Sequence, residues 1–87
     1  MSEKNDRKLT KRTIDALAAT GKDAVYWDRD LQGFGVRVYA SGRKVFVVQT
    51  RGPQGPRRVT LGRCGRVLAD AARKQAAEAI DRIKRGL

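Results

Sequence analysis

Two short runs rich in apolar residues, joined by a short turn, are the feature that most restricts the fold of this chain. They lie in residues 33–51, with the sequence GFGVRVYASGRKVFVVQTR. Apolar side chains at every second position predict β-strands with one buried face, here over residues 34–40 and 44–51. The Ser41-Gly42 pair between them is typical of a hairpin turn. An antiparallel sheet is therefore the predicted centre of the fold.

Two further strands are predicted on either side of this hairpin. The segment 24–28 is short and rich in β-branched and aromatic residues, which predicts a strand. Tyr26 and Trp27 are expected on its opposite faces. Residues 57–62 predict a fourth strand, and the Gly and Pro content of residues 52–56 predicts a loop before it.

Helical spacing of apolar residues occurs at both ends of the predicted sheet. From about residue 67 to 85 these residues recur at intervals of three and four, which predicts one long helix. A short helix is expected after Thr10 as its N-cap, ending at Gly21. Residues 1–8 are expected to be a disordered tail, so that 9–87 form a single domain. The predicted fold class is α+β, with a three- to four-stranded antiparallel sheet packed against a C-terminal α-helix and a short N-terminal helix.

The expected core combines one face of the sheet with one side of the long helix. A sheet this small must bury a face, and the long helix is the element able to cover it. The sheet residues are Val36, Val38, Phe46, Val48, Val59 and Leu61, and the helix residues are Leu68, Ala72, Ala76, Ile80 and Ile83.

The positive charge of the chain is concentrated in its middle. The sequence has 20 Lys and Arg against 9 Asp and Glu, a net charge of +11. No acidic residue occurs between Leu31 and Ala69, whereas eight basic residues do. Most of them are Arg, which is suited to bidentate contacts with phosphates and guanine edges. The charge pattern therefore predicts a polyanion as the partner.

The uncovered face of the sheet is the predicted binding surface, and it is expected to contain no acid. A ribbon of two or three strands fits the major groove of duplex DNA, about 12 Å wide. The residues expected on this face are Arg37, Tyr39, Val47, Gln49, Arg51, Arg58 and Thr60. Arg43 and Lys44 in the hairpin turn, and Arg57 after the loop, are expected to contact phosphates.

The remaining residue types argue against several other functions. The chain has no His and one Cys, which disfavours a zinc site and removes the commonest general base. Asp28 and Asp30 are interpreted as turn-capping residues. No catalytic residue, metal or cofactor is predicted. No apolar run is long enough for a membrane span or a signal peptide, and a single Cys fits a reducing cell interior.

Two other binding functions remain open on this evidence. An RNA-binding module would stack bases on sheet aromatics, for which only Tyr39, Tyr26 and Trp27 are candidates. A protein-interaction module would dock the basic face on an acidic partner.

An ordered set of short motifs runs through the chain from Leu9 to Gly86. It consists of Leu9-Thr10, Asp28 or Asp30 before Leu31, Gly33-Phe34-Gly35, Arg37-Val38, Ser41-Gly42-Arg43-Lys44 with Phe46, Arg58 to Gly62, and Ala72-Arg73 with Ala76. In this order the motifs resemble the N-terminal arm-type DNA-binding domain of phage and genomic-island integrases of the tyrosine recombinase family. No single motif is specific to that family, but the set is.

The resemblance implies a function for the whole chain. In that family the sheet enters the major groove of arm-type sites beside the recombination core and orients the integrase. Other domains or subunits of the integrase cut and rejoin the strands, and the Tyr, Arg and His set of their active site has no counterpart here. The chain is therefore expected to be a monomeric, non-catalytic domain of a longer recombinase that works on double-stranded DNA in the bacterial cytoplasm.

Overall fold

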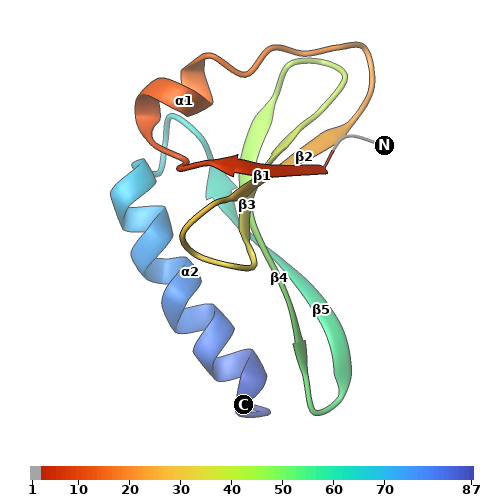
Figure 1. The fold of residues 1–87 in the computed structure, drawn as a ribbon, viewed down its shortest axis with the longest axis vertical. Coiled ribbons are helices and arrows are strands. Elements are labelled where there is room, and N and C mark those ends of the chain that lie inside the picture. The colour runs from red at the N-terminus through yellow and green to blue at the C-terminus, as the bar shows by residue number, and fades with distance from the viewer. Residues whose placement is uncertain (1–2) are drawn as a thin grey trace.

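A computed structural model of the chain describes residues 3–87 as one five-stranded sheet and two helices. The elements are β1 (Glu3–Arg7), α1 (Lys11–Asp15), β2 (Ala24–Asp28), β3 (Phe34–Val38), β4 (Lys44–Gly52), β5 (Gly55–Arg63) and α2 (Ala69–Lys84) (Figure 1). The strands lie side by side in chain order. The strands β2 to β5 are antiparallel to one another, while β1 runs parallel to β2 at the edge. The predicted α+β fold class is confirmed.

The strand β1 lies where the sequence predicted part of a disordered tail over residues 1–8. Its backbone pairs with β2 from Glu3, opposite Val25, to Arg7, opposite Asp28. Parallel pairing uses main-chain N–H and C=O groups and requires no alternation of apolar side chains. The sequence pattern therefore carried no signal for β1. Residues 1–2 of the expected tail lie outside the described residues.

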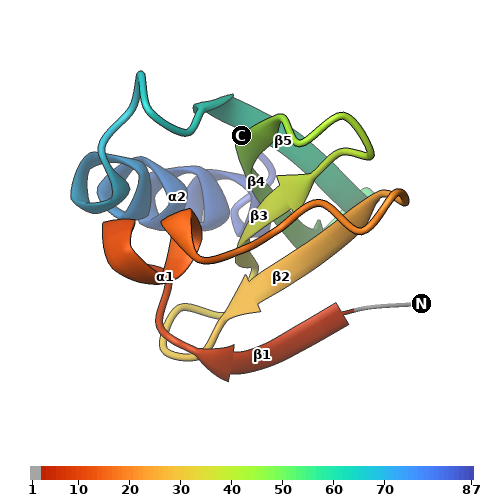
Figure 2. The same cartoon turned by 90° about the horizontal axis from the view of Figure 1, so that it is seen from above.

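Both helices cover the same face of the sheet, which we call the inner face (Figures 1 and 2). The rings of Phe34 and Phe46 stack there, with their centroids 5.8 Å apart. The buried core consists of Leu9, Ile14, Leu17, Phe34, Val36, Val38, Phe46, Val48, Ala72, Ala76, Ile80 and Ile83. Ala72 and Ala76 of α2 are fully buried, and their small side chains allow the helix to lie close to the strands. The opposite, outer face is left without a helix.

One predicted core residue is wrong, and two are only partly correct. Leu68 is 70% exposed because α2 begins at Ala69, so Leu68 is the extended N-cap and lies outside the buried stripe of the helix. Val59 and Leu61 of the edge strand pack against the core but are only partly buried.

The short helix α1 begins as predicted but ends earlier. Thr10 caps it in a reciprocal arrangement with Thr13. The helix ends at Asp15 with Ala16 as its C-cap, so the prediction that it continues to Gly21 is wrong. The ammonium group of Lys44 donates to the Ile14 carbonyl at 2.8 Å and so ties the end of α1 to β4.

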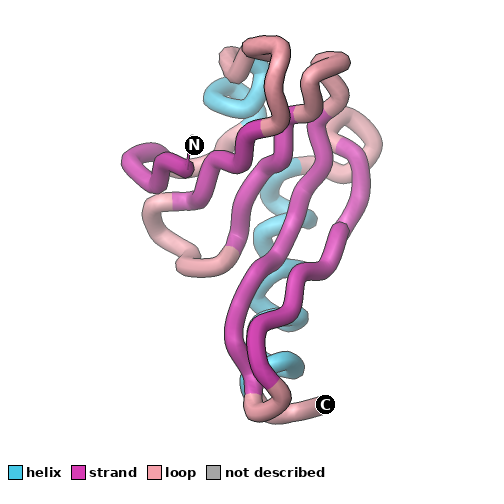
Figure 3. The backbone as a smooth tube through the Cα atoms, turned by 90° about the vertical axis from the view of Figure 1, so that its right-hand side faces the viewer, coloured by secondary structure: helices cyan, strands magenta, loops and turns pink. Residues whose placement is uncertain are grey.

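The hairpin of β4 and β5 extends beyond the other strands, alongside the C-terminal end of α2 (Figure 3). Its turn has two residues, Pro53 and Gln54, because Gly52 and Gly55 already pair across the strands. The predicted loop over residues 52–56 is therefore shorter in the structure. Gly52 lies directly against Ile83 of α2, where an added Cβ would overlap the Ile83 carbonyl oxygen.

A buried ion pair holds α2 to the other end of the sheet. The Asp28 side chain is fully buried and accepts two hydrogen bonds from the Arg73 guanidinium, at 2.6 and 2.8 Å. It also accepts from the N–H groups of Leu9, Asp30 and Leu31. Burial by itself would raise the pKa of Asp28, but the hydrogen bonds from Arg73 and these N–H groups outweigh it and lower the pKa from 3.8 to about 2. The predicted turn-capping role of Asp28 is thus confirmed and extends to the long helix.

Candidate nucleic-acid interface

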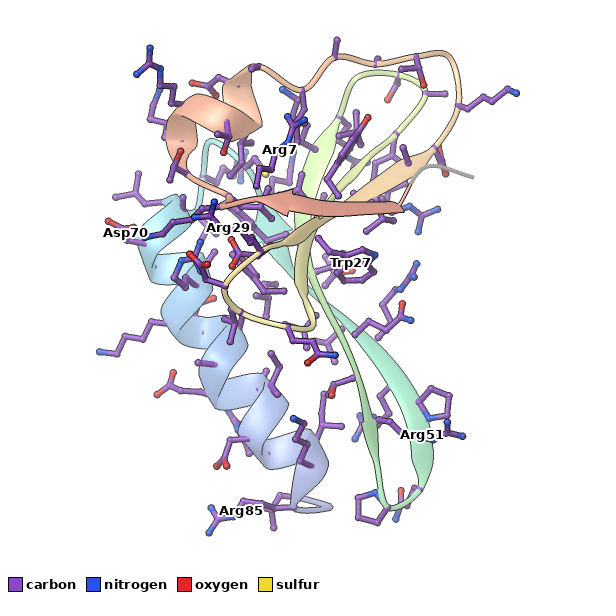
Figure 4. All side chains as sticks on the ribbon, in the orientation of Figure 1. Arg7, Trp27, Arg29, Arg51, Asp70 and Arg85 are labelled. Carbon is purple, nitrogen blue, oxygen red and sulfur yellow. The ribbon has the colours of Figure 1, made fainter. Side chains whose placement is uncertain are left out.

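The outer face of the sheet carries four arginines from three neighbouring strands. The strand register sets its residues in cross-strand rows: Val25, Arg37, Val45 and Arg63; Trp27, Gly35, Val47 and Thr60; Gln49 and Arg58; Arg51 and Pro56. We refer to Arg37, Arg51, Arg58 and Arg63 as the outer-face arginines. Figure 4 shows Arg51 and Trp27 on the side of the strands that faces away from α2.

The middle of the outer face consists of aromatic and apolar residues. Trp27 and Val47 flank Gly35 in the ladder, and a Cβ added at Gly35 would lie 2.6 Å from Cε3 of the indole. The absence of a side chain at Gly35 therefore lets the indole lie across β3. Val47 is only 2% exposed, although no helix covers this face.

Arg37 is held in place by a carboxylate from outside the strands. Its Nη2 atom donates to Oδ2 of Asp23 at 2.8 Å, while Oδ1 of Asp23 accepts from the Ala40 N–H at 3.1 Å. The hydrogen bond from Arg37 is the main reason that the pKa of Asp23 is lowered, and this carboxylate is ionised at neutral pH. The prediction of an outer face without acid is therefore wrong, because Asp23 lies before β2 in the sequence and reaches Arg37 through the fold.

Tyr39 lies close to two guanidinium groups at the edge of the outer face. The Cζ atom of Arg37 is 4.6 Å from the centre of the tyrosine ring, and that of Arg43 is 5.9 Å from it. Both distances fall within the range of cation–π attraction. The ring thus restrains Arg37 on one side, as Asp23 does on another.

Arg58 and Gln49 form a pair across β4 and β5. The Nε atom of Arg58 donates to Oε1 of Gln49 at 2.8 Å, and Nη2 of the same guanidinium donates to the same oxygen. Gln49 therefore has its acceptor oxygen engaged by Arg58, while its amide N–H groups keep their donor capacity.

Arg63 reaches the outer face because of a β-bulge. The register of β4 and β5 shifts between Phe46 and Val47, so that Val47 pairs with Thr60 while Phe46 pairs with Gly62. Leu61 is the extra residue, and Gly62 has a φ of 151°, in the region that favours glycine. Strict alternation would have put Arg63 on the inner face. The bulge places it opposite Val45 instead.

The described residues provide no sign of metal chemistry. Among residues 3–87, no group of three or more His, Cys, Asp or Glu side chains is arranged to hold a metal ion. Burial raises the pKa of the Cys64 thiol to about 11, which keeps it protonated. Within the same residues, no helix has the length and apolar character required to cross a membrane.

The basic outer face therefore lies opposite the inner face that α1 and α2 cover. Residues 9–87 match the sequence model of a family described as the Arm DNA-binding domain. The chain belongs to this family. The resemblance seen in the sequence is thereby confirmed. A search of curated proteins gives no significant match.

An arm DNA-binding domain binds DNA and is not itself a catalytic domain. In this arm DNA-binding domain, most of the residues predicted for the contact surface lie together. Those on the outer face and accessible there are Arg37, Gln49, Arg51, Arg58 and Thr60, with Tyr39 and Arg43 at its edge.

Three predicted contact residues are not accessible on the outer face of the arm DNA-binding domain. Val47 is buried and cannot offer its side chain to a thymine methyl group. The ammonium group of Lys44 is engaged by the Ile14 carbonyl. Arg57 pairs with Thr50, and both lie on the inner face of the sheet by strand alternation. Arg57 lines a hollow beside Ile83 there. These three therefore leave the set of proposed DNA contacts.

Sequence reasoning missed three residues of this surface. Arg63 was missed because the bulge reverses the alternation, and the only local signal was Gly62 inside an otherwise regular strand. Trp27 was assigned to a strand face but not to the site. Asp23 was missed because it lies outside the acid-free stretch.

Proposed function

We propose that the arm DNA-binding domain inserts its outer face into the major groove of duplex DNA and reads base edges there. The observation that carries this proposal is the strand register, which places four arginines of β3, β4 and β5 on the one face that no helix covers. DNA binding itself follows from the family; the groove and the contacting residues are the proposal.

The dimensions of the sheet support insertion into the major groove. Neighbouring strands lie about 4.8 Å apart, so β3, β4 and β5 together span about 10 Å between their outer backbones. The major groove is about 12 Å wide, whereas the minor groove, about 6 Å wide, is too narrow for three strands. The hairpin of β4 and β5 extends beyond the other strands (Figure 3) and would lengthen the part of the sheet that enters the groove.

The hydrogen bonds of the outer-face arginines suggest two roles. Arg37 and Arg58 are held by Asp23 and Gln49, and a held guanidinium is suited to a fixed pair of acceptors such as O6 and N7 of guanine. Gln49 gives its oxygen to Arg58, so we assign it to orienting Arg58 rather than to bidentate recognition of adenine. Arg51 and Arg63 are exposed and are assigned to phosphates, with Arg43 at the edge.

The biological setting of this activity is also proposed by family analogy. We propose that the domain tethers and orients a tyrosine recombinase at arm-type sites during site-specific integration, on DNA in the bacterial cytoplasm. Strand cleavage belongs to other domains of that integrase. The chain by itself is proposed to be monomeric, since its apolar residues are largely used in its own core.

Adjacent arginines on opposite faces of β5 test the proposed interface. We expect Arg58→Ala to lower the affinity for a preferred duplex by about 1–3 kcal/mol, because a base contact is lost, and to affect an unrelated duplex much less. The control Arg57→Ala removes the same charge from the neighbouring residue on the inner face and should change either affinity less than threefold, as a rough bound. Arg51→Ala should weaken both duplexes alike and reduce the salt slope by about 1. Fluorescence anisotropy over a series of salt concentrations measures all three.

Several results would contradict this assignment. Equal effects of Arg57→Ala and Arg58→Ala on every duplex would show that the domain senses only charge. Preference for single-stranded RNA over duplex DNA in competition would favour the RNA-binding alternative. Binding to an acidic protein but to no nucleic acid at physiological salt would favour the protein-interaction alternative.

The single tryptophan provides a direct optical test of which face meets DNA. Trp27 is the only Trp in the chain and lies on the outer face. A duplex bound over this face changes the environment of the indole, so its emission intensity should change as duplex is added and saturate at the same concentration as anisotropy. Unchanged emission at saturating duplex would place the DNA elsewhere on the domain.

A further inference from the structure

We infer that Asp23 is a positioning residue that gives Arg37 its ability to discriminate between base pairs. This inference rests on the proposed function, because it assumes that the outer face meets DNA. It concerns a residue outside the strands and of the opposite charge to the surface that it serves.

Asp23 links the Arg37 guanidinium to the backbone after β3. One carboxylate oxygen accepts from Nη2 of Arg37 at 2.8 Å, and the other is fixed by the Ala40 N–H just after β3. Tyr39 restrains the same guanidinium through its ring, 4.6 Å from Cζ. Arg37 makes no other side-chain hydrogen bond within residues 3–87. Its Nε and Nη1 donors therefore remain for a ligand.

The negative charge of Asp23 is unfavourable at a DNA-binding surface, so its position there calls for another role. A carboxylate beside a DNA-binding surface repels phosphates and lowers the affinity for every sequence. By accepting from Arg37, however, it restricts the rotamers of a long side chain that would otherwise follow the nearest phosphate. A guanidinium held in one orientation loses less entropy on meeting a guanine edge and adapts less readily to a wrong base. Asp23 thus exchanges overall affinity for discrimination.

Arg58 is held by Gln49, but the other two outer-face arginines have no such restraint. Arg51 and Arg63 have no side-chain hydrogen bond or ion pair within the described part of the chain, and they are free to follow the DNA backbone. Both Asp23 and Arg37 are part-exposed, with side-chain exposures of 47% and 32%. A pair this exposed adds little to folding stability, so a structural role for the pair is weak.

The test compares wild type, Asp23→Asn, Asp23→Glu and Arg37→Ala on two duplexes. One duplex is selected from a random library by the wild-type chain, and the other is a shuffled duplex of the same length and composition. Asp23→Asn should bind the shuffled duplex about two- to threefold more tightly, since a negative charge is removed. Its ratio of selected to shuffled affinity should fall about five- to tenfold, and Arg37→Ala should show the same fall. Asp23→Glu keeps a carboxylate and should recover part of the ratio.

Two controls separate positioning from charge and from folding. Asp81→Asn removes an acid that pairs with Arg85 on the exposed side of α2, and it should leave the ratio unchanged. The thermal midpoint of Asp23→Asn should stay within about 4 °C of wild type. In the double variant Asp23→Asn with Arg37→Ala, the ratio should equal that of Arg37→Ala, because Asp23 acts through Arg37.

The possible failures have different meanings. If Asp23→Asn keeps the wild-type ratio while Arg37→Ala lowers it, the inference about Asp23 is overturned and the proposed interface stands. If Arg37→Ala changes neither affinity, the proposed interface fails at this residue and the inference fails with it.

Discussion

Asp28→Asn is expected to destabilise the domain by about 3–5 kcal/mol, the usual range when one partner of a buried ion pair is removed. The two carboxylate oxygens of Asp28 accept only from donors: Oδ1 from Leu9 and Arg73, and Oδ2 from Asp30, Leu31 and Arg73. An amide replaces one acceptor by a donor. In either orientation, its NH₂ group faces at least two donors, and the Arg73 charge loses its counter-ion. Urea unfolding at neutral pH measures the loss.

A neighbouring acid and the pH dependence identify the cause of this loss. Asp30→Asn makes the same change of charge on an exposed residue and should shift stability by no more than about 0.5 kcal/mol. The pKa of Asp28 is lower in the folded domain than its usual 3.8, so its contribution is fully present above that value and is lost as the pH falls towards 2. Between pH 3.8 and about 2, the free energy of unfolding of the wild type should fall by about 2 kcal/mol because of Asp28 alone. A similar acid loss in Asp28→Asn would show that other carboxylates are responsible.

Charge pairs of this kind mark the limit of what the sequence could predict. Asp28 and Arg73 were both visible, but 45 positions separate them and no local pattern joins them. The same holds for Asp23 and Arg37, whose pairing corrected the expectation of an acid-free face. Side-chain pairs distant in sequence depend on tertiary geometry, whereas periodicity reports only which face of its own element a residue occupies.

The strands β2 to β5 and the helix α2 were predictable because the spacing of their apolar residues matches the faces that the fold buries. In β3 and β4 the face with Val36 and Phe46 is buried as expected, although the centre of β4 is apolar and buried on both faces. The prediction failed where backbone geometry departs from regular alternation. The bulge at Leu61 reversed the phase of β5 and moved Arg63 to the outer face, and the parallel pairing of β1 requires no apolar alternation in the sequence. Val47 was correctly placed on the outer face, but its burial depends on the neighbouring strand.

Gly52→Ala is expected to destabilise the domain by about 2–3 kcal/mol, through overpacking between the hairpin and α2. A Cβ at this position would overlap the carbonyl oxygen of Ile83 and lie 3.2 Å from Cγ2 of the same residue. The first obstacle is helix backbone rather than the end of a flexible side chain, so either the end of α2 or the hairpin must move. Because Arg51 precedes Gly52, the movement should also weaken duplex binding. Urea unfolding measures the loss of stability, the amide chemical shifts of residues 51–58 report the movement, and fluorescence anisotropy measures duplex binding.

Gly21→Ala provides the matched comparison, because it changes backbone conformation without crowding. Gly21 has a φ of 83° and nothing within 4 Å of an added Cβ, so its substitution costs only the strain of the left-handed conformation, about 1–2 kcal/mol. Gly52 has no such φ, and its cost comes entirely from contact with α2. We therefore expect Gly52→Ala to be the more destabilising of the two and the only one to change the amide shifts of Ile83 and its neighbours. If Gly21→Ala proved the more destabilising, the close approach of the hairpin to α2 would have to relax at little cost, and α2 would not fix the position of the DNA-binding hairpin.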